Sequence, residues 1–70
     1  MTEVKAELVG SVWKVKTQPG AQVAEEDELL VLESMKMEIP VTAPCAGTVA
    51  ELRVQPEDVV QEGDVVAVLE

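Results

Sequence analysis

The sequence repeats itself once, at an interval of 37 residues. Residues 10–33 align with residues 47–70 without a gap, and ten of the 24 aligned pairs are identical. Composition alone would give roughly two or three identities, so the repeat indicates two copies of one structural unit. The identical pairs are Gly10/Gly47, Val12/Val49, Gln18/Gln55, Pro19/Pro56, Val23/Val60, Glu25/Glu62, Asp27/Asp64, Val31/Val68, Leu32/Leu69 and Glu33/Glu70.

Each copy has the pattern of a short β unit. Its apolar runs are rich in valine, which favours strands, and none has a helical period long enough for a stable helix. Turn signals separate the runs at the spacing typical of a β-sandwich or barrel. The predicted strands are Val12–Thr17 and Leu29–Leu32 in the first copy, and Val49–Val54 and Val65–Leu69 in the second.

Two turns separate the strands of each copy. A Gln-Pro pair follows the first strand, where proline presets φ for a turn, and a polar turn precedes the last strand. Gly20 and Gly63 are suited to a positive φ in these turns. Their repeat partners are Glu57 and Glu26, so we expect the turns of the two copies to differ.

Two similar β units in one chain predict an all-β fold of two packed sheets related by a pseudo-twofold axis. We expect a first strand at Val4–Leu8 and a further strand at Glu38–Val41. A tight turn at residues 35–37 would then lie at the end of the sandwich opposite the N- and C-termini. Pro40 predicts an edge strand, because proline cannot donate to a sheet ladder.

Length and composition exclude several functions. The chain has 70 residues, enough for one domain spanning residues 1–70. It has no histidine, and Cys45 is its only cysteine. A Cys/His metal site or a nucleophile with its usual base therefore cannot be assembled. We predict no catalytic and no metal-ligating residues.

The net charge is −9, from 14 acidic and 5 basic residues. This balance disfavours nucleic acids and anionic membranes as partners, because both attract basic proteins. The N-terminus lacks the basic and apolar regions of a signal peptide, and no apolar run approaches the length of a membrane span. We expect a cytoplasmic protein that is monomeric in isolation and docks on basic partner surfaces.

The segment between the two copies is unusual, because Lys36 stands between Met35 and Met37, with Glu33 and Glu38 on either side. One interpretation is that both methionines pack into the core, since residues two apart in a strand share a face. A second is that the tip is merely solvated. A third is that an enzyme recognises Lys36 on its hairpin, with the flexible methionines as contact surface. The amine must be neutral to attack an acyl group, and we expect the partner enzyme to remove its proton.

The run Glu-Ser-Met-Lys-Met-Glu at residues 33–38 resembles the attachment motif of the biotinyl-domain family, in which the lysine of Met-Lys-Met receives biotin. The runs Ala43–Val49 and Glu62–Val65 are also similar to the family, and the resemblance extends over residues 4–69. It implies one biotinyl-attachment domain over residues 1–70. The implied fold is a flattened barrel or sandwich of two four-stranded antiparallel sheets with quasi-twofold symmetry.

The resemblance also implies a function. A biotin protein ligase would join biotin to Lys36 through an amide, using ATP to form biotinyl-adenylate, and Met35 and Met37 would help the ligase accept this lysine. The tethered biotin would carry a carboxyl group from a biotin carboxylase site to a carboxyltransferase site of a biotin-dependent carboxylase. The domain would be a carrier and not an enzyme. The residues that flank the site are Glu33, Ser34 and Glu38.

Two other functions remain open. A lipoyl carrier shares the fold and the hairpin lysine, although its typical motif is Asp-Lys-Ala. An unmodified domain would keep the sandwich and use its acidic surface for docking. The chain begins Met-Thr-Glu-Val with no Pro/Ala-rich linker before the first strand, so we expect a free-standing biotinyl protein.

Overall fold

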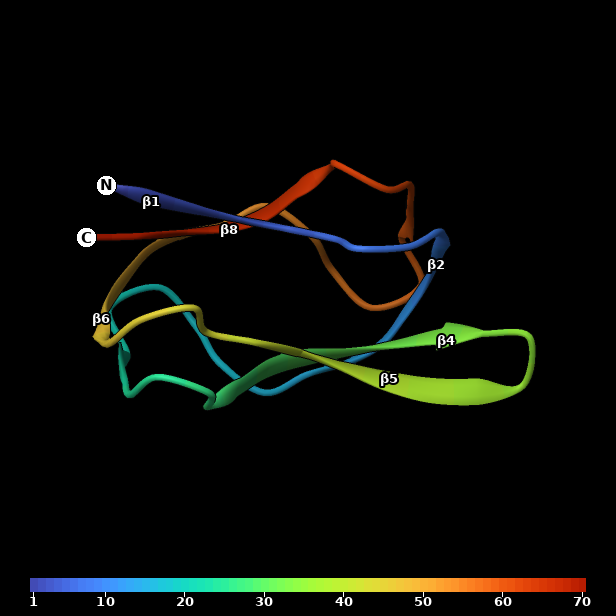
Figure 1. Cartoon of the computed structure of the whole chain (residues 1–70), viewed down its shortest axis with the longest axis horizontal. Coiled ribbons are helices and arrows are strands. Elements are labelled where there is room, and N and C mark those ends of the chain that lie inside the picture. The colour runs from blue at the N-terminus through green and yellow to red at the C-terminus, as the bar shows by residue number, and fades with distance from the viewer.

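Eight β-strands and no helix form the chain in a computed structural model, which describes residues 1–70. The strands make two four-stranded antiparallel sheets that form the two layers of a sandwich (Figure 1). No helix suited by length and hydropathy to crossing a membrane is present. One sheet has the order β1 (Thr2–Lys5), β8 (Val65–Leu69), β6 (Gly47–Leu52), β3 (Gln22–Val23), and the other has the order β5 (Met37–Thr42), β4 (Glu28–Ser34), β2 (Gly10–Val15), β7 (Val59–Val60).

The repeat accounts for this topology. Adding 37 to the residue numbers turns β2, β3 and β4 into β6, β7 and β8, and turns β1 into β5. The registers agree as well: Val4 lies opposite Ala67 in one sheet, and their counterparts Val41 and Leu30 lie opposite each other in the other sheet. The predicted sandwich of two four-stranded sheets with a pseudo-twofold axis is therefore confirmed.

The chain termini and the β4–β5 hairpin lie at opposite ends of an elongated molecule, whose extents are 31 × 17 × 17 Å. Thr2 pairs with Leu69 at one end, where Figure 1 shows the N- and C-termini side by side. At the other end the β4–β5 hairpin projects beyond the rest of the chain (Figure 1). The pseudo-twofold relation thus makes the β4–β5 hairpin at one end of the molecule equivalent to the pair of termini at the other end.

Aliphatic side chains alone fill the space between the sheets. The only aromatic residue, Trp13, lies at a bulge of β2 and is about half exposed. No polar side chain is buried. The core cluster holds 13 residues: Val4, Ala6, Val12, Leu29, Leu30, Leu32, Ala43, Val49, Val54, Val60, Val66, Ala67 and Leu69.

Several strand boundaries differ from the predictions. The first strand covers Thr2–Lys5 instead of Val4–Leu8, because the pairing with β8 shifts register at its end and residues 6–9 then cross to the other sheet. Strands β2 and β6 both begin and end earlier than predicted, at Gly10–Val15 instead of Val12–Thr17 and at Gly47–Leu52 instead of Val49–Val54. Strands β4 and β5 are longer than predicted, because their pairing continues to the tip of the hairpin.

Four turns of one type connect the strands, with a positive φ at the third residue of each: 90° at Gly20, 72° at Glu26, 78° at Glu57 and 91° at Gly63. In every turn the fourth residue donates its backbone N–H to the first carbonyl, with N···O distances of 3.0 or 3.1 Å. These are the features of a type II turn. The expectation that the turns of the two copies differ was wrong, because glutamate takes the same conformation as glycine at the equivalent position.

Aspartate side chains brace three of the four turns. These are both turns that carry glutamate and the turn at Gly63, where Asp64 Oδ2 accepts a hydrogen bond from the backbone nitrogen of Gln61 at 2.9 Å. Asp27 Oδ2 accepts a hydrogen bond from the backbone nitrogen of Ala24 at 2.8 Å, and Asp58 Oδ2 accepts one from that of Gln55 at 2.8 Å. Each carboxylate thus adds a second bond across the same turn. Local bonds of this kind stabilise turns, so they offset the strain at the glutamates.

Replacing Glu26 by glycine is expected to stabilise the protein by about 1 kcal/mol. A non-glycine residue in the left-handed conformation costs about 1–2 kcal/mol, and the greater backbone entropy of glycine in the unfolded chain offsets part of the relief. The melting temperature should rise by about 4–8 °C for a domain of this size. Calorimetry measures the change. Glu25→Gly removes the same charge one position earlier, where φ is negative, and should give no gain. Equal effects of the two variants would contradict the strain argument.

Candidate functional site at the β4–β5 hairpin

The β4–β5 hairpin turns at Met35 and Lys36. Ser34 is paired with Met37, which leaves these two residues as the whole loop. Their φ values are 53° and 68°, and two consecutive positive values define the type I′ turn, whose twist fits a two-stranded ribbon. We predicted a turn of residues 35–37, whereas the structure places Met37 in β5.

This turn forms without the residues that favour it. Asn and Gly are usual at these positions, and a longer side chain in the left-handed conformation costs about 1–2 kcal/mol. The β4–β5 ladder, which runs from the pair Glu28–Thr42 to the pair Ser34–Met37, holds the two residues in place. Backbone strain that the surrounding structure maintains is concentrated at functional sites.

The base of the hairpin rests against Gly10 of β2. A Cβ atom at Gly10 would lie 2.9 Å from the Glu33 carbonyl oxygen and 3.5 Å from Ser34 Cβ, so a larger residue would push the hairpin away. Sequence reasoning treated Gly10 only as one identity of the repeat. The identity of Gly10 and Gly47 was the signal of this close contact, because both glycines lie against the carbonyl of an equivalent glutamate. A Cβ at Gly47 would lie 2.5 Å from the Glu70 carbonyl oxygen. Gly10 therefore positions the strand that leads to Lys36.

The hairpin side chains are exposed at the tip. Met35 is 92% exposed and Met37 is 63% exposed, which excludes the interpretation that the methionines pack into the core. Lys36 is exposed as well, and Ser34 is half-buried. A large apolar side chain exposed in this way is a candidate for contact with a partner.

Lys36 forms no ion pair. The two ion pairs of the structure lie elsewhere, at Lys16 and Arg53. Glu33 and Glu38 are exposed and lie directly opposite each other on neighbouring strands, but neither comes within 4.0 Å of the Lys36 amine. The amine is therefore free of partners within the chain.

The hairpin gathers the residues singled out in the sequence around one exposed amine. All six residues singled out in the sequence, 33–38, lie together on the hairpin. The chain has no histidine that could act as a general base there, and no other side chain hydrogen-bonds to Lys36. What the hairpin offers chemically is one exposed primary amine at a two-residue turn.

Comparison with known proteins identifies the family. The family of biotin and lipoyl attachment domains, described as "biotin-requiring enzyme", matches residues 2–69. The chain is 49% identical over 67 residues to the biotinylated protein TB7.3 homolog of Mycobacterium leprae, covering 96% of this chain and 94% of that protein. It is 44% identical over 62 residues to the biotin/lipoyl attachment protein of Bacillus subtilis, covering 89% of this chain and 85% of that protein. The urea carboxylase of Kluyveromyces lactis contains a similar structure, with a TM-score of 0.93 and 32% identity, over 99% of this chain and 6% of that one. The chain therefore belongs to the biotin/lipoyl attachment family.

Proposed function

We propose that Lys36 receives biotin and that the chain, as a single domain, is a biotin carboxyl carrier. The observation that supports this most is the exposed Lys36 amine, which has no partner in the chain and stands at a two-residue turn between two exposed methionines. The similarity to a biotinylated protein of nearly the same length adds to it.

The attachment reaction would be performed by a biotin protein ligase. The neutral Lys36 amine attacks the acyl carbon of biotinyl-adenylate, an amide bond forms, and AMP leaves. The chain contributes the nucleophile and its placement. The proton of the amine passes to the ligase or to water, because no base of the chain hydrogen-bonds to Lys36.

The biotin-loaded chain would serve a biotin-dependent carboxylase. Biotin, when bound, accepts a carboxyl group at a biotin carboxylase site and gives it up at a carboxyltransferase site. The chain's contribution is the tether, which raises the local concentration of biotin to the order of mM at each site. The β4–β5 hairpin projects beyond the rest of the chain (Figure 1). Lys36 at its turn would therefore enter a partner's cleft while the sandwich stays outside. The similar structure within a urea carboxylase supports a partner of this class.

A ligase reaction tests the proposal. The purified chain is incubated with biotin, ATP and a biotin protein ligase, and biotin is detected by avidin blotting. We expect one labelled band that depends on ATP. An absence of label, with a known biotinyl domain labelled in a parallel reaction, would favour an unmodified docking domain instead.

A lipoyl group is the second candidate for Lys36. The name of the Bacillus subtilis relative includes both groups, and the hairpin offers the same amine to either. The two groups differ in mass, so intact mass spectrometry of the chain produced with biotin and lipoate both supplied distinguishes them. A lipoyl increment would replace biotin in the proposal.

Replacing Met35 or Met37 by alanine is expected to slow biotin attachment by about tenfold. Truncating a packed interface side chain costs on the order of 1–2 kcal/mol, and 1.4 kcal/mol is a factor of ten. Both side chains are exposed, so stability should change by no more than about 0.5 kcal/mol. Initial labelling rates and thermal unfolding measure the two effects. Val59→Ala, at another exposed apolar residue, is the matched control; equal slowing by all three variants would contradict recognition of the methionines.

A further inference from the structure

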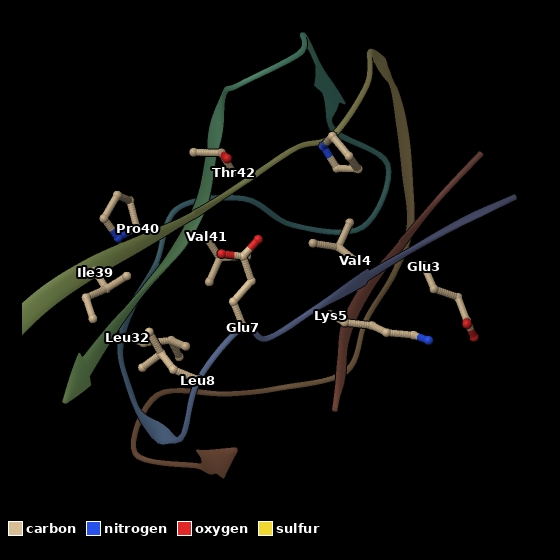
Figure 2. A pocket seen from close by; sticks show the side chains of 11 residues that line it. Glu3, Val4, Lys5, Glu7, Leu8, Leu32, Ile39, Pro40, Val41 and Thr42 are labelled. Carbon is tan, nitrogen blue, oxygen red and sulfur yellow. The ribbon is translucent and has the colours of Figure 1, made fainter. Parts of the chain in front are cut away.

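A groove of about 220 Å³ lies between the two edge strands β1 and β5 (Figure 2). One wall comes from Glu3–Lys5 and Glu7–Leu8, and the other from Ile39–Thr42. Strand β5 is also the strand that leaves the Lys36 turn. The groove therefore begins at Ile39, on the strand that follows the proposed attachment residue, and lies alongside that strand.

The groove lies on the pseudo-twofold axis but is not symmetric about it. Its lining includes both members of the repeat pairs Glu3/Pro40, Val4/Val41, Lys5/Thr42 and Glu7/Pro44. Leu8, Leu32 and Ile39 also line it, whereas their counterparts Cys45, Leu69 and Thr2 do not. Leu32 and Ile39 pair with each other on the hairpin side of Pro40. The groove thus extends farther toward Lys36 than toward the termini.

Different residues at equivalent positions cause this asymmetry. At the terminal end the Cys45 thiol lies 3.9 Å from Thr2 Oγ1 as a weak hydrogen-bond donor, and Cys45 packs against the core. At the hairpin end Leu8 and Ile39 are half-buried but do not pack against the core cluster. Their apolar surface is therefore available to another molecule.

Polar groups lie farther along the groove. Figure 2 shows the Glu7 side chain pointing from the segment after β1 toward β5. Neither Glu7 nor Lys5 takes part in an ion pair or a side-chain hydrogen bond. From Lys36 outward the groove therefore offers an apolar section and then an exposed carboxylate that has no partner within the chain.

We propose that the biotin on Lys36 folds back into this groove when no partner holds it. The bicyclic ring would lie against the half-buried Leu8 and Ile39, and the ureido N–H groups would donate to the Glu7 carboxylate. This inference rests on the proposed attachment at Lys36. The order of chemical groups along the biotinylated side chain matches the order along the groove. The arm and ring are apolar, and the ureido edge at the far end is a hydrogen-bond donor.

The distances allow this fold-back. At about 3.3 Å per residue, Ile39 lies about 10 Å and Val41 about 17 Å from Lys36 along the strand. Ten single bonds and one amide bond join Lys36 Cα to the ring of biotin, and they span about 12 Å when extended. The ring that follows then reaches the section between Ile39 and Val41. Because the tether gives a local concentration of the order of mM, a groove with a Kd of about 1 mM would be about half occupied.

The test compares amide NMR spectra of the unmodified and biotinylated chains. Intact mass first verifies one biotin per chain; if the ligase adds none, the proposed function itself fails and this inference with it. With biotin attached, we expect shifts at Glu7, Leu8, Val41 and Thr42, and contacts between ring protons and the Leu8 and Ile39 methyl groups. A chain pentanoylated at Lys36 lacks the ring and should shift only the hairpin. Biotinylated protein with changes confined to residues 33–39 would overturn the fold-back alone.

Variants of the groove test whether the shifts at Val41 and Thr42 come from the ring. Ile39→Thr introduces the residue that stands at the equivalent position of the first copy, Thr2. Leu8→Ser removes the apolar side chain from the opposite wall of the groove. Together they should abolish the shifts at Val41 and Thr42 while biotin is still attached. The control is Val59→Gln, which introduces the residue found at the equivalent position, Gln22. It removes an exposed apolar side chain outside the groove and should leave the shifts unchanged. Groove shifts that survive the double variant would contradict the assignment.

Discussion

Replacing Lys36 by arginine is expected to abolish biotin incorporation and leave the fold intact. Arginine keeps the positive charge, but its guanidinium stays protonated in proteins and cannot act as the attacking amine. Lys36 is exposed and has no ion-pair partner, so the free energy of unfolding should change by no more than about 0.5 kcal/mol. Avidin blotting measures incorporation, and circular dichroism measures stability.

The control for this substitution is Lys14→Arg. Lys14 lies on β2, in the sheet that contains the hairpin, and is exposed, but it is not at a turn. It should be labelled like the wild type, because the ligase would recognise the hairpin and not an exposed lysine as such. If Lys36→Arg were labelled as strongly as Lys14→Arg and the wild type, Lys36 would not be the attachment residue.

Replacing Leu29 by alanine is expected to lower the free energy of unfolding by about 2–5 kcal/mol, the usual cost of this truncation in a core. Leu29 is fully buried, with 0% of its surface exposed, and belongs to the core cluster. A domain of this length has a total stability of roughly 4–10 kcal/mol, so the substitution removes a large share. Biotin attachment should fall with the folded fraction, because the type I′ turn at Lys36 depends on the β4–β5 ladder.

Urea unfolding followed by circular dichroism measures this loss. With a slope of about 1 kcal/mol per M for a small domain, the midpoint should fall by about 2 M or more. Val59→Ala truncates a side chain that is 72% exposed and should leave the midpoint within about 0.5 M. A midpoint for Leu29→Ala close to that of Val59→Ala would contradict the description of the core.

The repeat made the fold predictable from the sequence. Two copies of one β unit required two equivalent sheets, and the interval of 37 residues relates the strands of one sheet to those of the other. The strand Val65–Leu69 was predicted with its observed boundaries. The ends of other strands were not predictable, because they depend on bulges such as those at Val12/Lys14 and Val4/Lys5, where the register shifts without a sequence signal.

The turns show where residue preference misled the prediction. Glutamate disfavours a positive φ, so its presence opposite Gly20 and Gly63 suggested different turns. The observed φ of 72° at Glu26 and 78° at Glu57 follows from the equivalent pairing of the two copies, which requires equivalent connections. Tertiary structure overrides local preference here, as it does at Met35 and Lys36.

The site was predictable in part. The six residues 33–38 are contiguous in the sequence, so their common place on one hairpin followed from the strand pattern. The contact of Gly10 with that hairpin and the groove beside β5 were not predictable, because both arise between segments distant in the chain. Sequence alone also left the methionines open between core and tip, which their exposure decides.

The most direct test of the account is the position of the modification on the wild-type chain. The protein is produced with a biotin protein ligase and biotin, its intact mass is measured, and its peptides are sequenced by tandem mass spectrometry. The account predicts one biotinyl group per chain, on Lys36 and on none of the other lysines, Lys5, Lys14 and Lys16. A biotinyl group on another lysine, a lipoyl group on Lys36, or an unmodified chain under conditions that label a known biotinyl domain would contradict it.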